Sequence, residues 1–534
     1  MYRQITLNEF EASDELSKIR MAIQYLKNHP YTSLKIPQGD YILADPMAKQ
    51  LQEDLMAGKY SNWPESKMFH KDFTYVSGLD FSDIHDVEII AYGVNFITDG
   101  FMETISLQFC KNITLKGLSL DMKRRPFSKG KIISATDQYT DVYFDDTFLL
   151  SKNNPYPRYG IYNHKTDRFL FGICETTARE QLDEHTIRIH NQSYPEQIGH
   201  DFYVTHTMHF RPAILIYEAK DITLEDVTIH AHDGMGIVGH RSENIQIKGL
   251  SVKPAGNNKI SVNTDATHFT SCKGYLKYEN CFFSGHGDDA LNVHTYYQTI
   301  LSHHDNICSL QVQAPTGTHA QKMDYPDPGD ILELVDKYSL APRKRFTVLS
   351  SDPDHKNWIC KVELNDALPD DCSNYLFVNV TQMPEVTFSN CICQSHRSRS
   401  ILIKAHHAKI ENCIFKNNSG TAIHIAAEGY WHEGACSKNV IIKNNIIENC
   451  GYGDGMILDA GGISVNILAP DANMPVHEKI TIEQNIILSP DTKYAISVGN
   501  TKQVIIKNNV LHAADDGIET HCCLDEYIQN NIII

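Results

Sequence analysis

The sequence VIIKNNIIE, residues 440–448, is one unit of a repeat that decides the fold. The theme returns as ITIEQNIIL at 480–488, VIIKNNVLH at 504–512 and YIQNNIII at 527–534. Each unit alternates β-branched residues, as a half-buried strand does, and then bends at Asn, Gly or Asp. Related units occur earlier, at residues 112–120, 221–229, 244–252, 275–283, 386–394 and 408–416. Start-to-start steps of 22 to 24 residues recur, and a strand-like repeat of this period predicts a solenoid.

The predicted fold class is all-β, a right-handed parallel β-helix. The leucine-rich pattern LxxLxLxxN is absent and no helical period lies inside the units, which excludes the main competing solenoid. Residues 12–27 predict a helix that covers the open N-terminal end of the strand stack. Residues 123–210 and 296–384 interrupt the repeat and alternate like antiparallel strands, so we predict two inserted β subdomains, the second barrel-like. The predicted domains are the N-terminal cap and first coils (1–122), the first insertion (123–210), the central coils (211–295), the second insertion (296–384) and the C-terminal coils (385–534).

Asparagine and cysteine recur next to each other in the repeat. One position of the unit is taken to be asparagine in seven units, and stacking of the coils then predicts a ladder of amides. These residues are Asn280, Asn390, Asn412, Asn445, Asn485, Asn509 and Asn531. The residues that follow them are Cys281, Cys391, Cys413, Ile446, Ile486, Val510 and Ile532. We therefore expect cysteine to replace Ile and Val in one interior column, as buried thiols. The cysteine spacings do not fit a zinc site.

Composition excludes several classes of partner. The net charge is −18, with 66 acidic against 48 basic residues, so neither nucleic acid nor an anionic membrane surface is an expected partner. Neutral substrates fit this charge better than polyanions. No run of eighteen apolar residues occurs, and the N-terminus shows no signal-peptide pattern, so a cytoplasmic location is predicted. The flanks of a β-helix and its insertions offer surface for a homodimer.

Three aspartates mark the candidate active site. Asp265 precedes the Asp288-Asp289 pair by 23 residues, about one coil of the repeat. We therefore expect Asp265 and Asp288 to share one column, with strands ~4.8 Å apart. Carboxylates this close raise the pKa of at least one of them, as a general acid requires. A second pair, Asp515-Asp516, has no acidic residue one coil earlier and is interpreted as a turn.

The segments NTDATHF (263–269) and GHGDDALNVH (285–294) resemble glycoside hydrolase family 110, bacterial enzymes that remove terminal α-1,3-linked galactose, as from the blood-group B antigen. The resemblance extends to RRPFSKGKI (124–132), SHRSRSILIKA (395–405) and GYWHEG (429–434), in order along most of the chain. It implies an inverting hydrolase without a cofactor or a metal ion.

The resemblance further implies that Asp265 is the general acid, and that Asp288 and Asp289 position and deprotonate the attacking water. Inverting enzymes hold their carboxyl groups ~6.5–9.5 Å apart and retaining enzymes ~5–5.5 Å. Stacking alone favours the retaining distance for Asp265 and Asp288, and the inverting distance for Asp265 and Asp289. We follow the family and predict inversion.

Further residues are predicted to bind substrate. Trp431, beside Glu433 in the YWHEG segment, is a candidate platform for a sugar ring, and packing under a loop is the alternative. Arg397, Arg399 and Lys404 share one strand region, where they are candidates to bind hydroxyl groups or orient a carboxylate. The remaining candidates lie near the acids or one coil earlier, and they are His286, Asn292, His294 and Arg241.

Three alternatives stay open from sequence. Polygalacturonases also carry NTD and DD on a β-helix, with the first Asp of the pair as acid, but their separate GHG and RIK motifs are not matched, because GHG is fused to the DD pair here. A polysaccharide lyase with Ca²⁺ and a basic residue is a second alternative. A non-catalytic carbohydrate-binding β-helix is the third, because a solenoid by itself does not specify a function.

Overall fold

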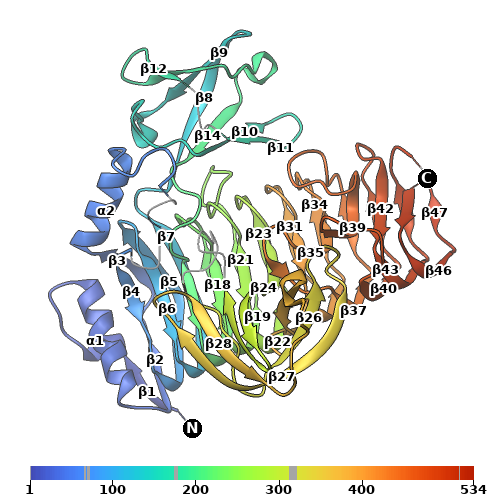
Figure 1. Cartoon of the computed structure of the whole chain (residues 1–534). Helices are drawn as coiled ribbons and strands as arrows, with labels where there is room; N and C mark the ends of the chain where they lie inside the picture. The colour runs from blue at the N-terminus through green and yellow to red at the C-terminus, as the bar shows by residue number, and fades with distance from the viewer. Residues whose placement is uncertain (1, 65–67, 69–72, 174–177, 312–321, 516) are drawn as a thin grey trace.

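The computed structural model describes residues 2–64, 68, 73–173, 178–311, 322–515 and 517–534. Within them the chain winds as a parallel β-helix with three faces, whose coils stack from the N-terminal to the C-terminal end (Figure 1). The predicted all-β class, with a parallel β-helix, an N-terminal helix and two antiparallel insertions, is confirmed.

Each face is a stack of parallel strands, and successive strands along the chain pass from face to face. The first face contains β4 (Ser77–Asp80), β6 (Glu103–Gln108), β15 (Ile214–Tyr217), β18 (Ile237–His240), β21 (Thr267–Thr270), the start of β24 (Leu291–His304), β32 (Ile401–Ile403), β35 (Ile423–Glu428), β39 (Ala460–Leu468), β42 (Tyr494–Gly499) and β45 (Gly517–His521). The short β36 (Glu433–Gly434) pairs with β24 and β35 in the antiparallel direction.

The second and third faces alternate along the chain. The second contains β1 (Arg3–Thr6), β2 (Thr32–Lys35), the starts of β5 (His85–Asp99) and β7 (Lys111–Met122), β16 (Lys220–Glu225), β19 (Glu243–Lys248), β22 (Lys273–Glu279), β30 (Glu385–Ser389), β33 (His406–Glu411), β37 (Lys438–Lys443), β40 (His477–Glu483), β43 (Thr501–Lys507) and β46 (Leu524–Gln529). The third contains β3 (Gly39–Ala44), the ends of β5 and β7, β17 (Thr228–Ile229), β20 (Ser251–Val252), β23 (Phe282–Ser284), β31 (Ile392–Gln394), β34 (Ile414–Lys416), β38 (Ile446–Glu448), β41 (Ile486–Leu488), β44 (Val510–His512) and β47 (Ile532–Ile533).

Helix α1 (Glu15–Lys27) lies at the N-terminal end of the stack (Figure 1). The Asp14 carboxylate caps it by accepting a hydrogen bond from the Ser17 N–H at 2.8 Å. The buried face of α1 includes Leu16, Ile19 and Ile23. This apolar face covers a coil whose interior would otherwise meet water, as the sequence predicts. A second helix, α2 (Pro46–Met56), begins after the cap residue Asp45.

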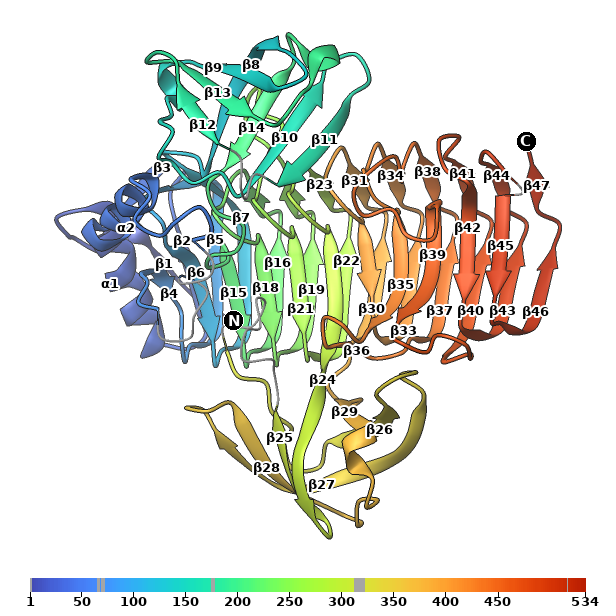
Figure 2. The same cartoon turned by 45° about the horizontal axis from the view of Figure 1, so that its top comes forward.

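The two insertions leave the solenoid at opposite edges (Figure 2). The first forms a seven-stranded antiparallel sheet in the spatial order β11 (Arg168–Ile173), β10 (Arg158–Asn163), β14 (Asp201–Thr205), β8 (Phe127–Ala135), β9 (Tyr139–Phe144), β13 (Thr186–His190), β12 (Arg179–Gln181). The second closes a six-stranded barrel from the end of β24, β25 (Ile307–Gln311), β28 (Ile359–Leu364), β27 (Pro342–Asp354), β26 (Ile331–Asp336) and β29 (Tyr375–Asn379). Strand β24 therefore belongs to both the first face and the barrel.

The predicted amide and thiol columns are in fact one column. Strand pairing aligns Cys281 with Cys391, Cys391 with Cys413, and Cys413 with Asn445. The column continues through Asn485, Asn509 and Asn531. The prediction that Asn280, Asn390 and Asn412 join this ladder is wrong, because they occupy the preceding turn position, where φ is 54–56°. Ile446, Ile486 and Ile532 are consequently exposed rather than interior.

The amide part of the column satisfies buried backbone groups. The Asn485 Oδ1 atom accepts hydrogen bonds from the backbone N–H of Asn445 and from its Nδ2, both at 3.0 Å. The Asn485 Nδ2 donates to the Ile442 carbonyl at 3.1 Å and to Asn509 Oδ1 at 3.0 Å. Each amide thus bridges adjacent coils at a turn where the backbone alone leaves polar groups unpaired.

Replacing Asn485 with Ala should destabilise the solenoid. The substitution leaves the buried N–H of Asn445 without its partner and removes the amide donor to the Ile442 carbonyl, at a cost of about 2–4 kcal/mol in the free energy of unfolding. The matched control is Asn531→Ala at the end of the same column, where solvent can replace the lost bonds. Thermal and urea unfolding of both variants measure the difference, and equal losses would contradict the role assigned to the buried ladder.

Candidate active site

The three aspartates lie in turns that connect the third face to the first. Asp265 precedes β21, and Asp288 and Asp289 precede β24. The two strands pair with His268 opposite Asn292, so Asp289 rather than Asp288 is the register partner of Asp265. The prediction that Asp265 and Asp288 share a column is wrong by one residue, because this coil holds 24 residues. The Asp289 N–H donates to Asp265 Oδ1 at 3.2 Å.

Gly287 allows these turns to stack closely. A Cβ atom on Gly287 would lie 2.1 Å from the Asn263 carbonyl oxygen of the preceding coil. The close approach brings one carboxylate oxygen from each of Asp265, Asp288 and Asp289 within 4.8 Å of the others. Asp265 and Asp289 are buried, whereas Asp288 is partly exposed. The site therefore faces solvent on the side of Asp288.

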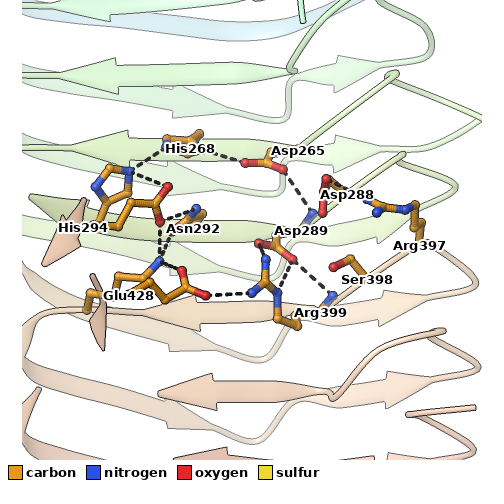
Figure 3. A network of polar contacts seen from close by, with 12 residues as sticks. Asp265, His268, Asp288, Asp289, Asn292, His294, Arg397, Ser398, Arg399 and Glu428 are labelled. Atoms are coloured by element: carbon orange, nitrogen blue, oxygen red, sulfur yellow. Dashed lines mark hydrogen bonds and ion pairs between the residues drawn. The ribbon is translucent and has the colours of Figure 1, made fainter. Parts of the chain in front are cut away.

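Two arginines from the next coil bind the aspartate pair (Figure 3). Arg399 binds Asp289 through two parallel hydrogen bonds, from Nε to Oδ1 and from Nη2 to Oδ2, both at 3.0 Å. Its backbone N–H donates to the same Oδ1 at 3.1 Å. Arg397 donates from Nη1 to Asp288 Oδ2 at 2.7 Å, and its Nε donates to Asp454 at 2.6 Å. These bidentate and charge-assisted contacts fix the orientation of both carboxylates.

The same arginines give Asp288 and Asp289 different pKa values. Burial by itself raises the pKa of Asp288, but the charges of Arg397, Arg158 and Arg399 outweigh it and hold the pKa well below its usual range. Burial raises the pKa of Asp289 to about 7, because the charges of Asp288 and Asp265 add to burial against the opposing charge of Arg399. Asp288 is thus ionised at neutral pH, and Asp289 changes its charge near pH 7.

A buried lysine connects the remaining acidic residues. Lys404 Nζ contacts Glu428 Oε2 at 2.7 Å and forms a second ion pair with Glu433 Oε2. It also donates to Asn292 Oδ1 at 3.4 Å. Glu428 returns to the aspartates, because its Oε1 accepts from Arg399 Nη1 at 3.3 Å. Burial of two glutamates is tolerated here because Lys404 and Arg399 neutralise them.

Two histidines close the network on the other side (Figure 3). His268 on β21 contacts Asp265 Oδ2 through Nδ1 at 2.6 Å and His294 Nε2 through its own Nε2 at 2.9 Å. His294 Nε2 lies 3.6 Å from Glu433 Oε1. Of the predicted residues, the structure therefore joins the following into one polar network: Asp265, Asp288, Asp289, Asn292, His294, Arg397, Arg399, Lys404 and Glu433.

Three predicted binding residues lie outside this network. His286 is buried beneath the turn, where its Nδ1 contacts the Asp288 carbonyl at 2.7 Å and its ring stacks on His396 at 3.9 Å between centroids. Arg241 is bound to Glu218 and Asp327 in a separate cluster near the barrel. Trp431 lies on the turn between β35 and β36, two residues from Glu433, and is 50% exposed. A role in stacking on a sugar stays a prediction for Trp431.

Sequence reasoning missed Arg158 and Glu428. Arg158 comes from β10 of the first insertion, and its Nη1 donates to the Gly287 carbonyl at 2.6 Å while Nη2 lies 3.9 Å from Asp288 Oδ2. The first insertion contains no repeat, so the coil register could not predict that Arg158 lies beside the aspartates. Glu428 ends the buried strand IHIAAE. A charge in an otherwise apolar strand is costly unless it is paired, and that signal could have identified it.

Known proteins are similar to this chain in fold and in sequence. The family described as "Right handed beta helix region" matches residues 374–534, in agreement with the predicted handedness. Alpha-1,3-galactosidase B of Bacteroides thetaiotaomicron is 25% identical over an alignment that covers 96% of this chain and 88% of its own. Alpha-1,3-galactosidase A of Shewanella woodyi is 24% identical, covering 88% and 79%. The resemblance to glycoside hydrolase family 110 is confirmed.

A third relative is also named an alpha-1,3-galactosidase. Alpha-1,3-galactosidase A of Bacteroides fragilis is 25% identical, covering 86% of this chain and 81% of its own. These alignments span most of the coils rather than the carboxylate turns alone. Within the residues described, no helix is long and apolar enough to cross a membrane.

Lys404→Met should strongly destabilise the protein, because it leaves Glu428 and Glu433 buried without their cation, at a cost of about 3–5 kcal/mol. In the native protein burial raises the pKa of Glu428, but Lys404 and Arg399 outweigh it and lower the pKa. That contribution is complete at both pH 5 and pH 8, because both lie above the unfolded pKa of glutamate. Without Lys404, burial should raise the pKa of the glutamates, so they take up protons as the pH falls. The deficit of Lys404→Met should therefore be larger at pH 8 than at pH 5.

The matched control for this prediction is Lys409→Met on the neighbouring strand β33. Lys409 pairs with Glu411 at 2.5 Å on the surface, and such pairs contribute about 0–1 kcal/mol. Denaturant unfolding at both pH values compares the two variants. Equal and pH-independent losses in Lys404→Met and Lys409→Met would show that the buried lysine does not neutralise the two glutamates.

Proposed function

We propose that this protein is an exo-acting α-galactosidase that hydrolyses terminal α-1,3-linked galactose from neutral glycans. One observation carries the proposal: three carboxylates from two successive coils lie with an oxygen of each within 4.8 Å of the others. They do so in a chain whose alignment with an alpha-1,3-galactosidase covers 96% of its length. Paired carboxylates of different acidity supply the acid and the base that glycoside hydrolysis requires.

The environments of the three carboxylates suggest a division of roles. Asp289, with a pKa of about 7, suits a general base that removes a proton from the attacking water near neutral pH. Asp288 is held ionised by arginines and positions that water. Asp265 is the general acid, which protonates the glycosidic oxygen as the bond from the anomeric carbon breaks. The water oxygen then forms the new bond to that carbon.

The pairing of the basic residues supports a neutral sugar over a galacturonate. Arg397, Arg399 and Lys404 are each bound to carboxylates of the protein itself. In the part of the site that the structure describes, these cations are already neutralised and are poorly suited to a substrate carboxylate. The polygalacturonase arrangement also needs the first Asp of the pair as acid, whereas the arginines hold the pKa of Asp288 well below its usual range.

Separate Asp265→Asn, Asp288→Asn and Asp289→Asn substitutions should each lower turnover strongly while retaining the fold. General acid or base catalysis contributes about 10²–10⁴-fold to the rate, so losses of that size are expected on an α-1,3-galactosyl trisaccharide. The matched control is Asp515→Asn, which changes an exposed residue and should keep full activity; its neighbour Asp516 in the second aspartate pair lies outside the described residues. Full activity of Asp265→Asn would contradict the assignment.

The acidic side of the pH profile should report Asp289. A base must be deprotonated to act, and its raised pKa places that change at about 7, so kcat/KM should fall as the pH drops below about 7. Glu428 shares Arg399 with Asp289. Glu428→Gln removes the competing negative charge, leaves the cation to Asp289 alone and should shift this limb to lower pH. An unmoved limb in Glu428→Gln would mean that another group sets it.

Family 110 resemblance implies inversion at the anomeric carbon. Proton NMR during early hydrolysis of p-nitrophenyl α-galactoside should therefore show β-galactose before mutarotation produces the α form. Initial release of α-galactose would show that the reaction retains configuration, and Asp289 would then act as a nucleophile instead of a base.

A further inference from the structure

A chain of hydrogen bonds runs from Asp265 into the protein interior. Asp265 Oδ2 lies 2.6 Å from His268 Nδ1, and His268 Nε2 lies 2.9 Å from His294 Nε2. The His294 Nδ1 atom lies 3.0 Å from the carbonyl oxygen of Thr295. Both rings are buried, so water does not replace these partners.

The Thr295 carbonyl at the end of this series of hydrogen bonds determines which atom donates and which accepts in each of them. A carbonyl oxygen only accepts hydrogen bonds, so His294 Nδ1 carries a hydrogen. Burial lowers the pKa of His294 to about 3, and the neutral ring therefore presents an unprotonated Nε2. His268 Nε2 must donate to it, which leaves His268 Nδ1 as the acceptor in a neutral ring. The bond to Asp265 then requires a proton on Asp265 Oδ2.

The charges around Asp265 also favour one additional proton in this network. Apart from the exposed Asp454, which Arg397 also binds, five carboxylates of the network, on Asp265, Asp288, Asp289, Glu428 and Glu433, face four cations, on Arg158, Arg397, Arg399 and Lys404. When Asp289 is ionised, as a base must be, one additional proton makes this set neutral. Burial also lowers the pKa of His268, although Glu433, Asp289 and Asp288 oppose it and Lys404 supports it. The proton therefore lies on Asp265 rather than on the imidazole.

We propose that His268 is a positioning residue that keeps Asp265 protonated, and that His294, anchored on the Thr295 carbonyl, holds His268 in the tautomer that makes this possible. The inference rests on the proposed function, in which Asp265 is the general acid. A hydrogen bond to the neutral form of a carboxyl group favours that form. The histidine pair therefore supplies a proton-bearing acid within a cluster of carboxylates.

The proton balance over one turnover is closed. Asp265 gives its proton to the glycosidic oxygen, which takes the electron pair of the broken bond to the anomeric carbon. Asp289 takes one proton from the attacking water, whose oxygen bonds that carbon. Transfer of this proton from Asp289 back to Asp265, whose carboxylates lie close together, restores the starting state. His268 Nδ1 then accepts again from Asp265.

The alkaline limb of the pH profile tests the role of His268. In His268→Asn an amide can donate to Asp265 and stabilise its ionised form, so the limb should move down by about one pH unit or more, a tenfold change in proton affinity. His294→Phe should also move the alkaline limb to lower pH, because His268 Nε2 then has no acceptor and His268 can carry its hydrogen on Nδ1 instead. His294→Gln retains an acceptor for His268 and should therefore keep the alkaline limb at the wild-type pH. His303→Asn in the barrel is the matched control, and its limb should stay unchanged.

Nitrogen-15 NMR of histidine-labelled protein tests the tautomers without requiring activity. The expected spectrum has His268 protonated at Nε2 and bare at Nδ1, and His294 protonated at Nδ1, with assignments from the His268→Asn and His294→Gln variants. A hydrogen on His268 Nδ1 with a bare Nε2, or an unmoved alkaline limb in His268→Asn, would overturn the inference. An inactive wild type with the expected tautomers would instead contradict the proposed function.

Discussion

The site depends on the hydrogen-bonded register between three strands of the first face. Pairing of β21 with β24, and of β24 with β32, places Asp265, Asp289 and Arg399 one above the other. Because side chains alternate between the two sides of a strand, a slip of one residue would turn these groups away from one another. The register itself is held by the buried interior of the coils, where Phe269, Val293 and Ile403 are covered on every side. Packing of the solenoid thereby sets the distances between the charged groups.

Neutralisation of charge explains how so many ionised groups are tolerated in this setting. Removing carboxylates from water costs several kcal/mol each unless cations and hydrogen bonds compensate. Arg397, Arg399 and Lys404 come from the coil that follows the aspartates, and Arg158 comes from the first insertion. The arrangement lets one carboxylate stay ionised, a second titrate near neutrality and a third hold a proton. Differences in environment, rather than in residue type, separate the three roles.

Much of the fold is predictable from the sequence because its repeat is local. The period of 22 to 24 residues and the buried face of α1 follow directly from the spacing of apolar residues. The asparagine column was misplaced by one residue because each unit has two adjacent polar positions, such as Asn444 and Asn445, and composition does not distinguish the turn position from the interior one. Asp265 was paired with Asp288 for a related reason, since coil length varies from 23 to 24 residues.

The repeat does not predict contacts between residues that an insertion separates, or contacts made by the insertions themselves. Asp289 and Arg399 are 110 residues apart, with the barrel between them, so their adjacency appears only when β24 pairs with β32. The same holds for Arg158, which belongs to a sheet with no repeat. His268 was visible beside Asp265 in sequence, but its role depends on the Thr295 carbonyl, a backbone group that side-chain patterns do not report.

The central claim is that Asp265 supplies the proton and Asp289 activates the water. The most direct measurement compares Asp265→Asn and Asp289→Asn on an α-1,3-galactosyl disaccharide and on 2,4-dinitrophenyl α-galactoside, whose leaving group needs no protonation. The account predicts that Asp265→Asn loses about 10²–10⁴-fold on the disaccharide and less than about tenfold on the activated substrate, whereas Asp289→Asn loses heavily on both. Recovery of Asp289→Asn on the activated substrate, with none for Asp265→Asn, would contradict it.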